Sequence, residues 1–441
     1  MGTDEYRHTE DRSRDGLEKK VMAGLFLLMV CLFSATGMLM PDRAYSPMEN
    51  RFLAQMPTLR LQGILSAEYM RAMEEYVTDQ FPGRDFWVSL KSFCQKLSGQ
   101  KENNGVYYSS DGYLIGKPQE AAEDVLGRNL SAVLALQSVG FDVSLLVCPM
   151  AVEILADKLP SFAYTPEQAN LMTRLRKDAQ DAFVDVEAGL RQAAADGRQV
   201  FFRTDHHWTM AGAYAAYQAY MDWLGEEARP LASFTENLAS DAFYGTLWSK
   251  NSHPGISPDS IYYYEPDRSG EAPAPVYEVG FFDGSNTAWS DSLYQREYLE
   301  QKDKYAFFLG QNKPLVTVKR YTQATETTMA DASAISAGTE TPAETHAETP
   351  VATSAEMPAT APAEMRKLLL FKDSYAHCFA PFLFIHFDEI HMIDLRYWKQ
   401  DPIAYMEEQG ITQVLFLYSA DSFSSDRSIS MLGAYIAAHA Q

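Results

Sequence analysis

The sequence has few cysteines, and they follow no recognisable pattern. Its 441 residues include only Cys31, Cys94, Cys148 and Cys378. These four form no CxxC motif and show no Cys/His spacing typical of zinc sites. One of them, Cys31, lies in an apolar N-terminal run, which leaves an odd number elsewhere. The sequence therefore predicts neither a disulfide framework nor a structural metal site.

The chain also lacks positive charge. It carries 37 Lys and Arg residues against 59 Asp and Glu residues, and its formal net charge at pH 7 is −22. We find no basic patch that could neutralise nucleic-acid phosphates, so the charge argues against a nucleic-acid partner. The charge is compatible with a soluble domain outside a cell.

Long apolar runs are absent except at residues 21–40, VMAGLFLLMVCLFSATGMLM. This length matches the roughly 20 residues that a membrane-spanning helix needs. Lys19 and Lys20 precede the run, which predicts a cytoplasmic tail at 1–20, a transmembrane anchor at 21–40 and an extracellular remainder. The expected location is the cell membrane, with a single pass. A cleaved signal peptide is the rival interpretation, although no clean small-x-small cleavage site follows.

Phe, Trp, Tyr, Lys and Arg are missing from residues 322–365, which are rich in Ala, Thr, Glu and Pro. Such a segment cannot bury enough apolar surface to offset the entropy lost on ordering, so we expect disorder there. Residues 41–66 carry turn residues and predict a stalk. The remaining residues, 67–441, are expected to form one domain that the disordered insertion interrupts.

Strand and helix patterns alternate through this domain. Short apolar runs predict strands, and segments with apolar residues at helical spacing separate several of them. We therefore expect an α/β fold with a mostly parallel sheet covered by helices on both faces. The principal strands are predicted at 142–148, 314–318, 367–371, 389–393 and 413–417.

The most informative motif is residues 204–209, TDHHWT. The preceding residues 199–202 read as a strand, and Thr209 can cap a helix that starts at Met210. In an extended backbone, positions i and i+2 point the same way. Asp205 and His207 would then share a face, with the carboxylate orienting the imidazole as a general base. His206 would point elsewhere and have a structural role.

A matching nucleophile follows the buried strand at 367–371. Ser374 lies just past the C-terminal end of that strand, where a turn can expose an activated hydroxyl. Together with Asp205 and His207 it suggests a Ser-His-Asp triad. The neighbouring Asp373 is more simply a turn residue.

A metal site is the main alternative for the Asp-His-His string. Enzymes that bind metals through such a string need further Asp and His motifs on other strands, and we find no such set in the sequence. A purely structural motif is the second alternative, with Trp208 in the core. We favour the triad and assign no metal.

These residues and several other motifs resemble the DHHW family of bacterial surface proteins, which is related to the alginate O-acetyltransferases of the SGNH-hydrolase superfamily. The resemblance covers roughly residue 44 to the C-terminus, apart from the insertion. The motifs that carry it are SPMENR at 46–51, FPGRD at 81–85, NGVY at 104–107, DKLP at 157–160, TDHHWT at 204–209, GTLWSK at 245–250, KDSYA at 372–376, PFL at 381–383 and IDLRY at 393–397.

The resemblance implies an SGNH-like fold with Ser374 as nucleophile, His207 as base and Asp205 as the orienting residue. Lys372 replaces the glycine of the usual Gly-Asp-Ser. The backbone N–H of Ser374 is a natural oxyanion donor. Residues 310–312, Gly-Gln-Asn, are similar to the Gly-x-Asn block of SGNH hydrolases, which makes Asn312 a second oxyanion candidate.

The expected function is therefore an extracytoplasmic O-acyltransferase, with acetyl as the expected group, that modifies a surface or cell-wall polysaccharide. No cofactor is expected, because acetyl-CoA is not available outside the cell. The family context implies a membrane-bound O-acyltransferase as the acyl donor. An SGNH-type carbohydrate esterase and a catalytically silent glycan-binding or assembly protein are the alternatives.

Overall fold

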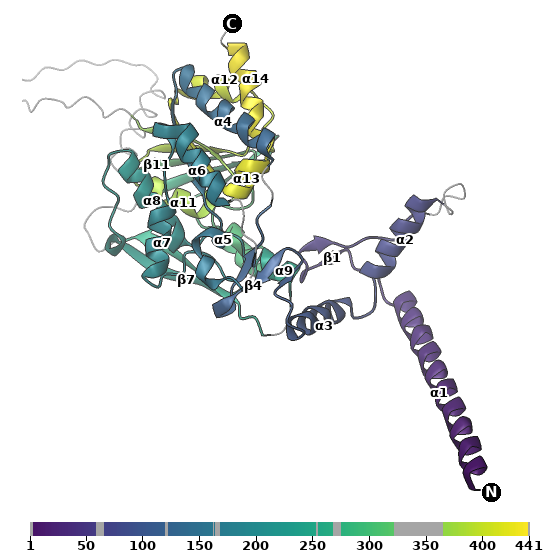
Figure 1. Cartoon of the computed structure of the whole chain (residues 1–441). Coiled ribbons are helices and arrows are strands. Elements are labelled where there is room, and N and C mark those ends of the chain that lie inside the picture. The colour runs from purple at the N-terminus through teal and green to yellow at the C-terminus, as the bar shows by residue number, and fades with distance from the viewer. Residues whose placement is uncertain are drawn as a thin grey trace, which may run out of the picture. The chain divides into compact units, whose positions relative to one another are not determined.

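The computed structural model describes residues 3–58, 66–119, 122–161, 163, 168–252, 255–267, 275–321 and 365–439, with side chains from residue 18 onward. Apart from Met365, the predicted disordered insertion lies outside the described residues. The chain divides into two compact units, Met1–Asn104 with Trp248–Ile256, and Gly105–Leu247 with Ser257–Gln441 (Figure 1). The division into tail, anchor, stalk and domain stays a prediction.

The first unit begins with a long helix, α1 (Thr3–Leu39). Its segment Glu18–Leu39 is long and apolar enough to cross a membrane, and none of its most apolar window is buried. Residues 67–97 form two helices that are separated at Phe81-Pro82-Gly83. The other elements of this unit are β1 (Tyr45–Ser46), β2 (Arg51–Phe52), α2 (Ala67–Asp79), α3 (Arg84–Leu97) and β3 (Glu102–Asn103).

An ion-pair network joins the SPMENR and FPGRD motifs within this unit. Arg84 lies 3.0 Å from Glu49, and Arg51 lies 2.6 Å from the carboxylate of Asp79. Asp79 is buried, and it also accepts a hydrogen bond from the backbone of Ala54. The hydrogen bond from Arg51 lowers the pKa of Asp79 to about 2. The two motifs thus hold the turn before α2 against the start of α3.

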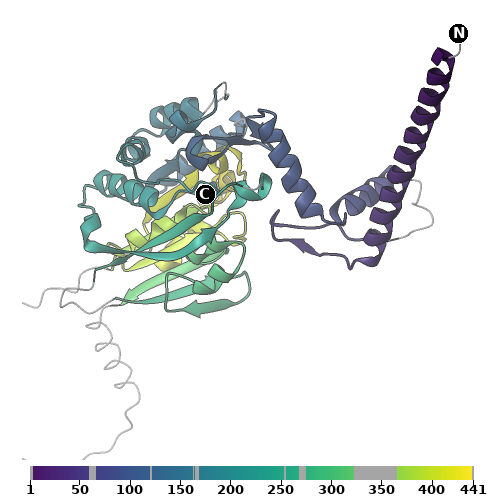
Figure 2. The same cartoon turned by 90° about the horizontal axis from the view of Figure 1, so that it is seen from below.

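The second unit contains a seven-stranded sheet in the order β10-β9-β11-β13-β12-β14-β6. Strands β6, β14, β12 and β13 are adjacent in this order, and each pair among them is parallel. Strands β11, β9 and β10 complete the sheet with antiparallel pairs. Figure 2 shows this sheet from below. Its strands are β6 (Asp142–Cys148), β9 (Val276–Phe282), β10 (Thr287–Ser290), β11 (Leu315–Tyr321), β12 (Lys367–Lys372), β13 (Glu389–Ile393) and β14 (Gln413–Ser419).

The α/β fold was predicted, but the sheet is mixed rather than mostly parallel. The five principal strands predicted from apolar runs are present, and β6 and β13 have the predicted bounds. The difference comes from the antiparallel pairing of β11, β9 and β10. Of these three strands, β9 and β10 were not predicted from the sequence. Their side chains are mostly half-buried or exposed. Strands that are not buried on both faces lack the continuous apolar run by which parallel strands are recognised.

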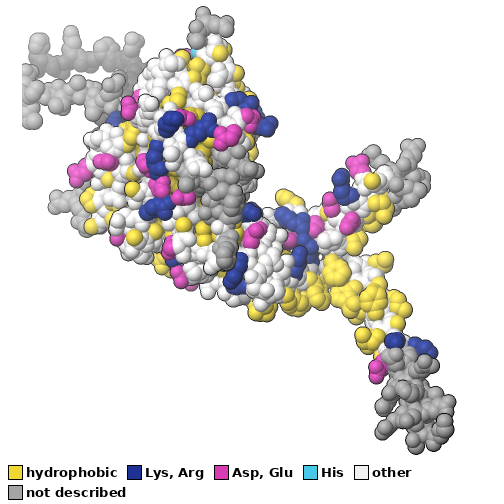
Figure 3. Space-filling view, in the orientation of Figure 1, with side chains coloured by type: hydrophobic (Ala, Val, Ile, Leu, Met, Phe, Trp, Pro, Cys, Tyr) yellow, Lys and Arg dark blue, Asp and Glu magenta, His cyan; other side chains and the backbone are white. Residues whose placement is uncertain are grey.

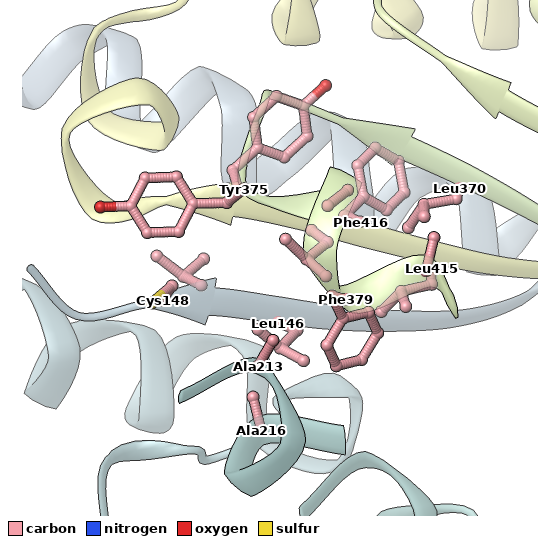
Figure 4. Packing of buried hydrophobic residues seen from close by; sticks show 14 of the residues in the cluster. Leu146, Cys148, Ala213, Ala216, Leu370, Tyr375, Phe379, Leu415 and Phe416 are labelled. Atoms are coloured by element: carbon pink, nitrogen blue, oxygen red, sulfur yellow. The ribbon is translucent and has the colours of Figure 1, made fainter. Parts of the chain in front are cut away.

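Helices cover both faces of the sheet. Figure 4 shows Ala213 and Ala216 of α8 and Phe379 of α11 beside Leu146 and Leu415 of the sheet. Side chains alternate along a strand, so Tyr418 of β14 points to the opposite face from Leu415. The ring of Tyr418 lies 6.3 Å from that of Phe423 on α13. The helices of this unit include α4 (Glu123–Ser138), α5 (Ala151–Ile154), α6 (Gln168–Ala179), α7 (Glu187–Ala195), α8 (Met210–Trp223), α11 (Ala376–Leu383), α12 (Pro402–Gln409), α13 (Ala420–Ser425) and α14 (Leu432–His439).

Two hairpins and a short helix lie outside the seven-stranded sheet. The first hairpin is the antiparallel pair β4 (Val106–Tyr108) and β5 (Leu114–Gly116). A second pair, β7 (Phe234–Phe243) and β8 (Asp259–Pro266), was not predicted. The short helix α9 (Thr246–Lys250) starts inside the GTLWSK motif.

Candidate active site

The DHHW segment is a series of bends and not a strand. Residues 203–207 are bends, and the strand predicted at 199–202 is reduced to a single bridge between Phe201 and Trp208. The side chain of Thr209 caps α8 by accepting a hydrogen bond from Gly212 N–H, as predicted. Because the backbone is not extended, the expected alternation fails for His206. Its ring centroid lies 3.8 Å from that of His207 instead of pointing away.

Asp205 is buried and accepts four hydrogen bonds. One carboxylate oxygen accepts from the backbone N–H of His207 at 3.0 Å and lies 2.6 Å from His207 Nδ1. The other oxygen accepts from Thr246 N–H at 2.7 Å and from Thr246 Oγ1 at 2.9 Å. Burial alone would raise the pKa of Asp205, but the two imidazoles and these hydrogen bonds outweigh it and lower the pKa. Asp205 is therefore ionised at neutral pH.

A second buried carboxylate holds the loop that carries Asp205. Asp259 accepts hydrogen bonds from the backbone N–H of Arg203 and Thr204 and from the Thr204 hydroxyl, at 2.7–2.9 Å. Burial raises its pKa. The Thr204 hydroxyl in turn accepts from Gly245 N–H at 3.1 Å. These contacts set the position of Asp205 relative to the GTLWSK motif.

The turn after β12 positions Ser374. Asp373 accepts hydrogen bonds from Tyr375 N–H, from Ser419 N–H and from the Ser419 hydroxyl, so it acts as the turn residue that we predicted. None of these bonds uses the N–H of Ser374. The indole N–H of Trp208 donates to the carbonyl of Tyr375 at 2.9 Å. This bond ties the DHHW segment directly to the serine turn.

The three residues proposed as a triad meet in space. Ser374 Oγ lies 2.7 Å from His207 Nε2, and His207 Nδ1 lies 2.6 Å from Asp205. Asp205 and His207 are buried, whereas Ser374 is half-buried. The carboxylate accepts from Nδ1, so Nε2 is left to accept the serine proton. This arrangement can activate the Ser374 hydroxyl as a nucleophile.

Several residues near the triad were not identified from the sequence. The ring of Tyr305 stacks on His207 with centroids 3.7 Å apart, and its hydroxyl donates to the carbonyl of Ser374 at 3.1 Å. Nothing in the sequence around Tyr305 indicated this role. Thr246 lies in a motif that the family resemblance singled out, so that motif was a signal, but its contact with Asp205 required the structure.

Lys372 occupies the place of the usual glycine and is completely buried. Its Nζ lies 2.8 Å from Asn312 Oδ1, 2.6 Å from His377 Nε2 and 3.9 Å from Asp394. Burial lowers the pKa of Lys372 to about 8. Burial and the charge of Lys372 also lower the pKa of His377, whose neutral ring can then accept from Lys372. The structure thus places Asn312 beside the end of β12, with its oxygen held by Lys372.

Asp205, His206 and His207 could also be considered as metal ligands. One ligand atom from each lies within 4.8 Å of the others. However, His207 Nδ1 and Asp205 are 2.6 Å apart. Two ligands of a tetrahedral metal with bonds near 2.0 Å lie roughly 3.3 Å apart. The present spacing fits a hydrogen bond, so metal binding would require these side chains to separate.

Sequence comparisons agree with the resemblance described above. A model of the SGNH hydrolase-like domain of the acetyltransferase AlgX matches residues 108–255, and a model of the DHHW proteins matches residues 187–335. Both matches include Asp205 and His207, but Ser374 lies beyond them. The chain is related to the DHHW proteins and the alginate O-acetylases.

Two curated relatives to which this chain is similar carry the name "Probable alginate O-acetylase AlgJ". The protein from Pseudomonas putida is 27% identical over 201 residues, which cover 42% of this chain and 51% of the relative. The protein from Pseudomonas fluorescens is 25% identical over 194 residues, which cover 41% and 48%. The chain thus spans about half the length of the curated relatives it matches.

Solved structures show the same fold. A DHHW family protein from Eubacterium siraeum superposes with a TM-score of 0.54 at 20% identity, covering 75% of this chain and 96% of that one. Bacillus cereus PatB1 with a sulfonyl adduct superposes with a TM-score of 0.52 at 21% identity, covering 73% and 98%. These similarities show the α/β fold, and the match of residues 108–255 to the SGNH hydrolase-like model makes this fold SGNH-like.

Proposed function

We propose that the chain is an extracytoplasmic O-acyltransferase that transfers an acyl group, with acetyl as the expected group, to a hydroxyl of a surface or cell-wall polysaccharide. The observation that carries the proposal is the continuous hydrogen-bond chain from Ser374 through His207 to Asp205, at 2.7 and 2.6 Å. The similarity to SGNH-like acetyltransferases supports this reaction class.

In the first half-reaction Ser374 becomes acylated. His207 Nε2 takes the hydroxyl proton while Ser374 Oγ attacks the carbonyl carbon of an acyl ester. Asp205 stabilises the imidazolium that forms. The tetrahedral intermediate then collapses, the bond to the donor oxygen breaks, and His207 returns the proton to that leaving oxygen. The products are acyl-Ser374 and the free donor alcohol.

In the second half-reaction the acyl group moves to the acceptor. His207 removes the proton of a sugar hydroxyl, and the sugar oxygen attacks acyl-Ser374. Collapse of this intermediate breaks the bond to Ser374 Oγ, which regains a proton from His207. If water is the acceptor instead, the same steps describe a carbohydrate esterase. The two reactions differ only in the acceptor.

The negative oxygen in each step needs hydrogen-bond donors. We assign this role to the backbone N–H of Ser374 and to the side-chain amide of Asn312. The contact from Lys372 to Asn312 Oδ1 supports the second assignment, because it directs the amide nitrogen away from Lys372. In this assignment, the contact with Lys372 holds the side-chain amide of Asn312 in one orientation.

The proposal includes a location and an acyl donor. The apolar run at 21–40 directly follows Lys19 and Lys20, and the segment Glu18–Leu39 is long and apolar enough to cross a membrane. Together these features predict a single-pass anchor with the catalytic unit outside the cell. A membrane-bound O-acyltransferase would supply the acyl group, because acetyl-CoA does not reach this compartment. Protease treatment of intact cells should remove the catalytic unit. A unit that is protected until lysis would contradict this topology.

The decisive experiment uses the full chain in detergent with an activated acetyl ester. We expect ester cleavage, a mass increase of one acetyl group on the peptide that contains Ser374, and reaction of Ser374 with a sulfonyl fluoride. Ser374→Ala is the control and should lose all three signals. Full activity in Ser374→Ala would contradict the covalent mechanism. A folded wild-type protein that shows none of these signals would support the silent glycan-binding role.

Adding soluble acetyl acceptors distinguishes the transferase from the esterase. If oligosaccharides become acetylated at the expense of hydrolysis, the chain is a transferase. If hydrolysis continues unchanged at every acceptor concentration, the chain is an esterase.

A further inference from the structure

Helix α3 exposes an apolar stripe along one side. Its members are Phe86, Trp87, Leu90, Phe93 and Leu97, with exposed fractions of 62, 43, 37, 38 and 70%. Positions 86, 90, 93 and 97 are three or four residues apart and therefore lie on one face of the helix. We call these five residues the α3 stripe.

The opposite side of α3 is polar and packs within the first unit. Ser92 is buried, Ser89 Oγ lies 3.6 Å from Met48 Sδ, and Arg84 pairs with Glu49 at 3.0 Å. A surface helix of a soluble protein normally buries its apolar face and exposes its polar face. Here the two faces are reversed, which indicates that the environment of the α3 stripe is not water.

The region at the start of α3 contacts the end of the candidate membrane span. The ring of Phe33 on α1 stacks on Phe81 at 5.2 Å and meets Trp87 edge-on at 6.1 Å. Phe33 lies six residues before Leu39, the last residue of α1, which corresponds to about 9 Å along the helix axis. The rings of Phe81 and Trp87 therefore lie at the level of the apolar run.

Charged residues flank the α3 stripe. At roughly 100° per residue, exposed Lys91 lies about 40° beyond Trp87, and exposed Lys96 lies about 60° beyond Phe93 on the other edge. Lysines in such positions can extend toward phosphate head groups while their stems cover apolar surface. Figure 3 shows yellow apolar side chains along the lower side of α3 and around its junction with α1. This pattern is typical of helices that lie in a membrane interface.

We propose that α3 is an interfacial helix that lies in the outer surface of the phospholipid bilayer that α1 spans. The α3 stripe would enter the boundary between head groups and acyl chains, and Lys91 would contact anionic head groups. This inference rests on the topology in the proposed function. It adds a second membrane attachment next to the transmembrane anchor, formed by the apolar side chains of the α3 stripe.

The native Cys94 provides a probe, because it is exposed and lies four residues after Leu90, at the edge of the α3 stripe. The full chain with Cys31→Ser is labelled at Cys94 with an NBD dye and reconstituted in nanodiscs of phosphatidylcholine and phosphatidylglycerol. Cys148 and Cys378 are buried and should not react. The matched control carries Lys96→Cys with Cys94→Ser and Cys31→Ser. Its label lies about 200° around the same helix.

We expect spin-labelled lipid to quench the dye at position 94 at least about threefold more strongly than the dye at position 96. Leu90→Gln with Phe93→Gln should abolish the difference, while α1 keeps the protein in the disc. Equal quenching at both positions would overturn the inference. So would a dye at position 94 that is shielded from aqueous quencher but not quenched by lipid, because protein would then cover the stripe.

The outcome is independent of catalysis. Ser374→Ala should show the same quenching as the wild type, so an inactive triad does not affect the result. A chain that fails to remain in the nanodisc would overturn both the single-pass topology and the interfacial position of α3. A chain that remains in the disc with both dyes in water would overturn the interfacial position alone.

Discussion

Gly245→Ala should strongly reduce the proposed acyl-transfer activity by displacing Asp205. A Cβ atom at this position would lie 2.2 Å from Asp205 Cβ and 2.4 Å from Asp205 Oδ2. Ordinary contact requires a separation at least about 1 Å larger. Asp205 cannot yield without stretching hydrogen bonds, because its Oδ2 accepts from Thr246 N–H at 2.7 Å and its Oδ1 lies 2.6 Å from His207 Nδ1.

The size of the effect follows from this displacement. Moving Asp205 by about 1 Å would stretch its hydrogen bonds beyond the normal range. A misplacement of about 1 Å in catalytic geometry can reduce the rate by about 100-fold, which corresponds to about 3 kcal/mol of transition-state stabilisation. We therefore expect Gly245→Ala to lower kcat by about 100-fold. Overpacking should also lower the free energy of unfolding by about 1–3 kcal/mol.

The assay compares acetyl-ester cleavage and thermal unfolding of the full-length wild type, Gly245→Ala and the control Gly433→Ala. An added Cβ at Gly433 meets nothing within 4 Å, so this control makes the same chemical change without a clash. It should retain wild-type activity and stability. A folded Gly245→Ala protein with a kcat within threefold of the wild type would refute the reasoning, since Asp205 would then tolerate displacement or be dispensable.

Three further predictions follow from other contacts. Ser374→Ala and His207→Ala should each abolish acyl transfer, and the double variant should lose little more, because both residues act in one step; additive losses would contradict the triad. Burial lowers the pKa of Lys372 from 10.5 to about 8. Between these two pH values the unfolded chain binds more protons than the folded chain. In denaturant titrations, the wild type should therefore gain stability relative to Lys372→Met as the pH rises from about 8 to 10.5. A stability difference that does not change with pH would contradict this prediction. The hydrogen bond from Arg51 lowers the pKa of Asp79 from 3.8 to about 2. Its stabilising contribution should be present above pH 3.8 and be lost as the pH falls toward 2, and Asp79→Asn should remove this part of the acid sensitivity in unfolding curves.

Much of the sheet and the candidate site could be predicted from local sequence patterns. Strands β6 and β13 were predicted with their observed bounds, because strands buried on both faces need continuous apolar runs. Asp205 and His207 were paired correctly for a different reason from the one expected. They meet because the Asp205 carboxylate turns back to accept the backbone N–H of His207, and not because the backbone is extended.

The tertiary structure alone decided the features that depend on residues far apart in the chain. The antiparallel pairing of β11, β9 and β10 made the sheet mixed. The side chains of β9 and β10 are mostly half-buried or exposed, so no continuous apolar run in the sequence predicted these two strands. Likewise, Tyr305 stacks on His207, and Lys372 contacts Asn312. In each pair the two residues are far apart in the sequence and meet only in the folded chain. By itself the sequence determined which residues could take part in catalysis, because it gives the residue types and indicates which segments are buried. Which neighbours would orient those residues was decided by packing between distant segments, which no local pattern records.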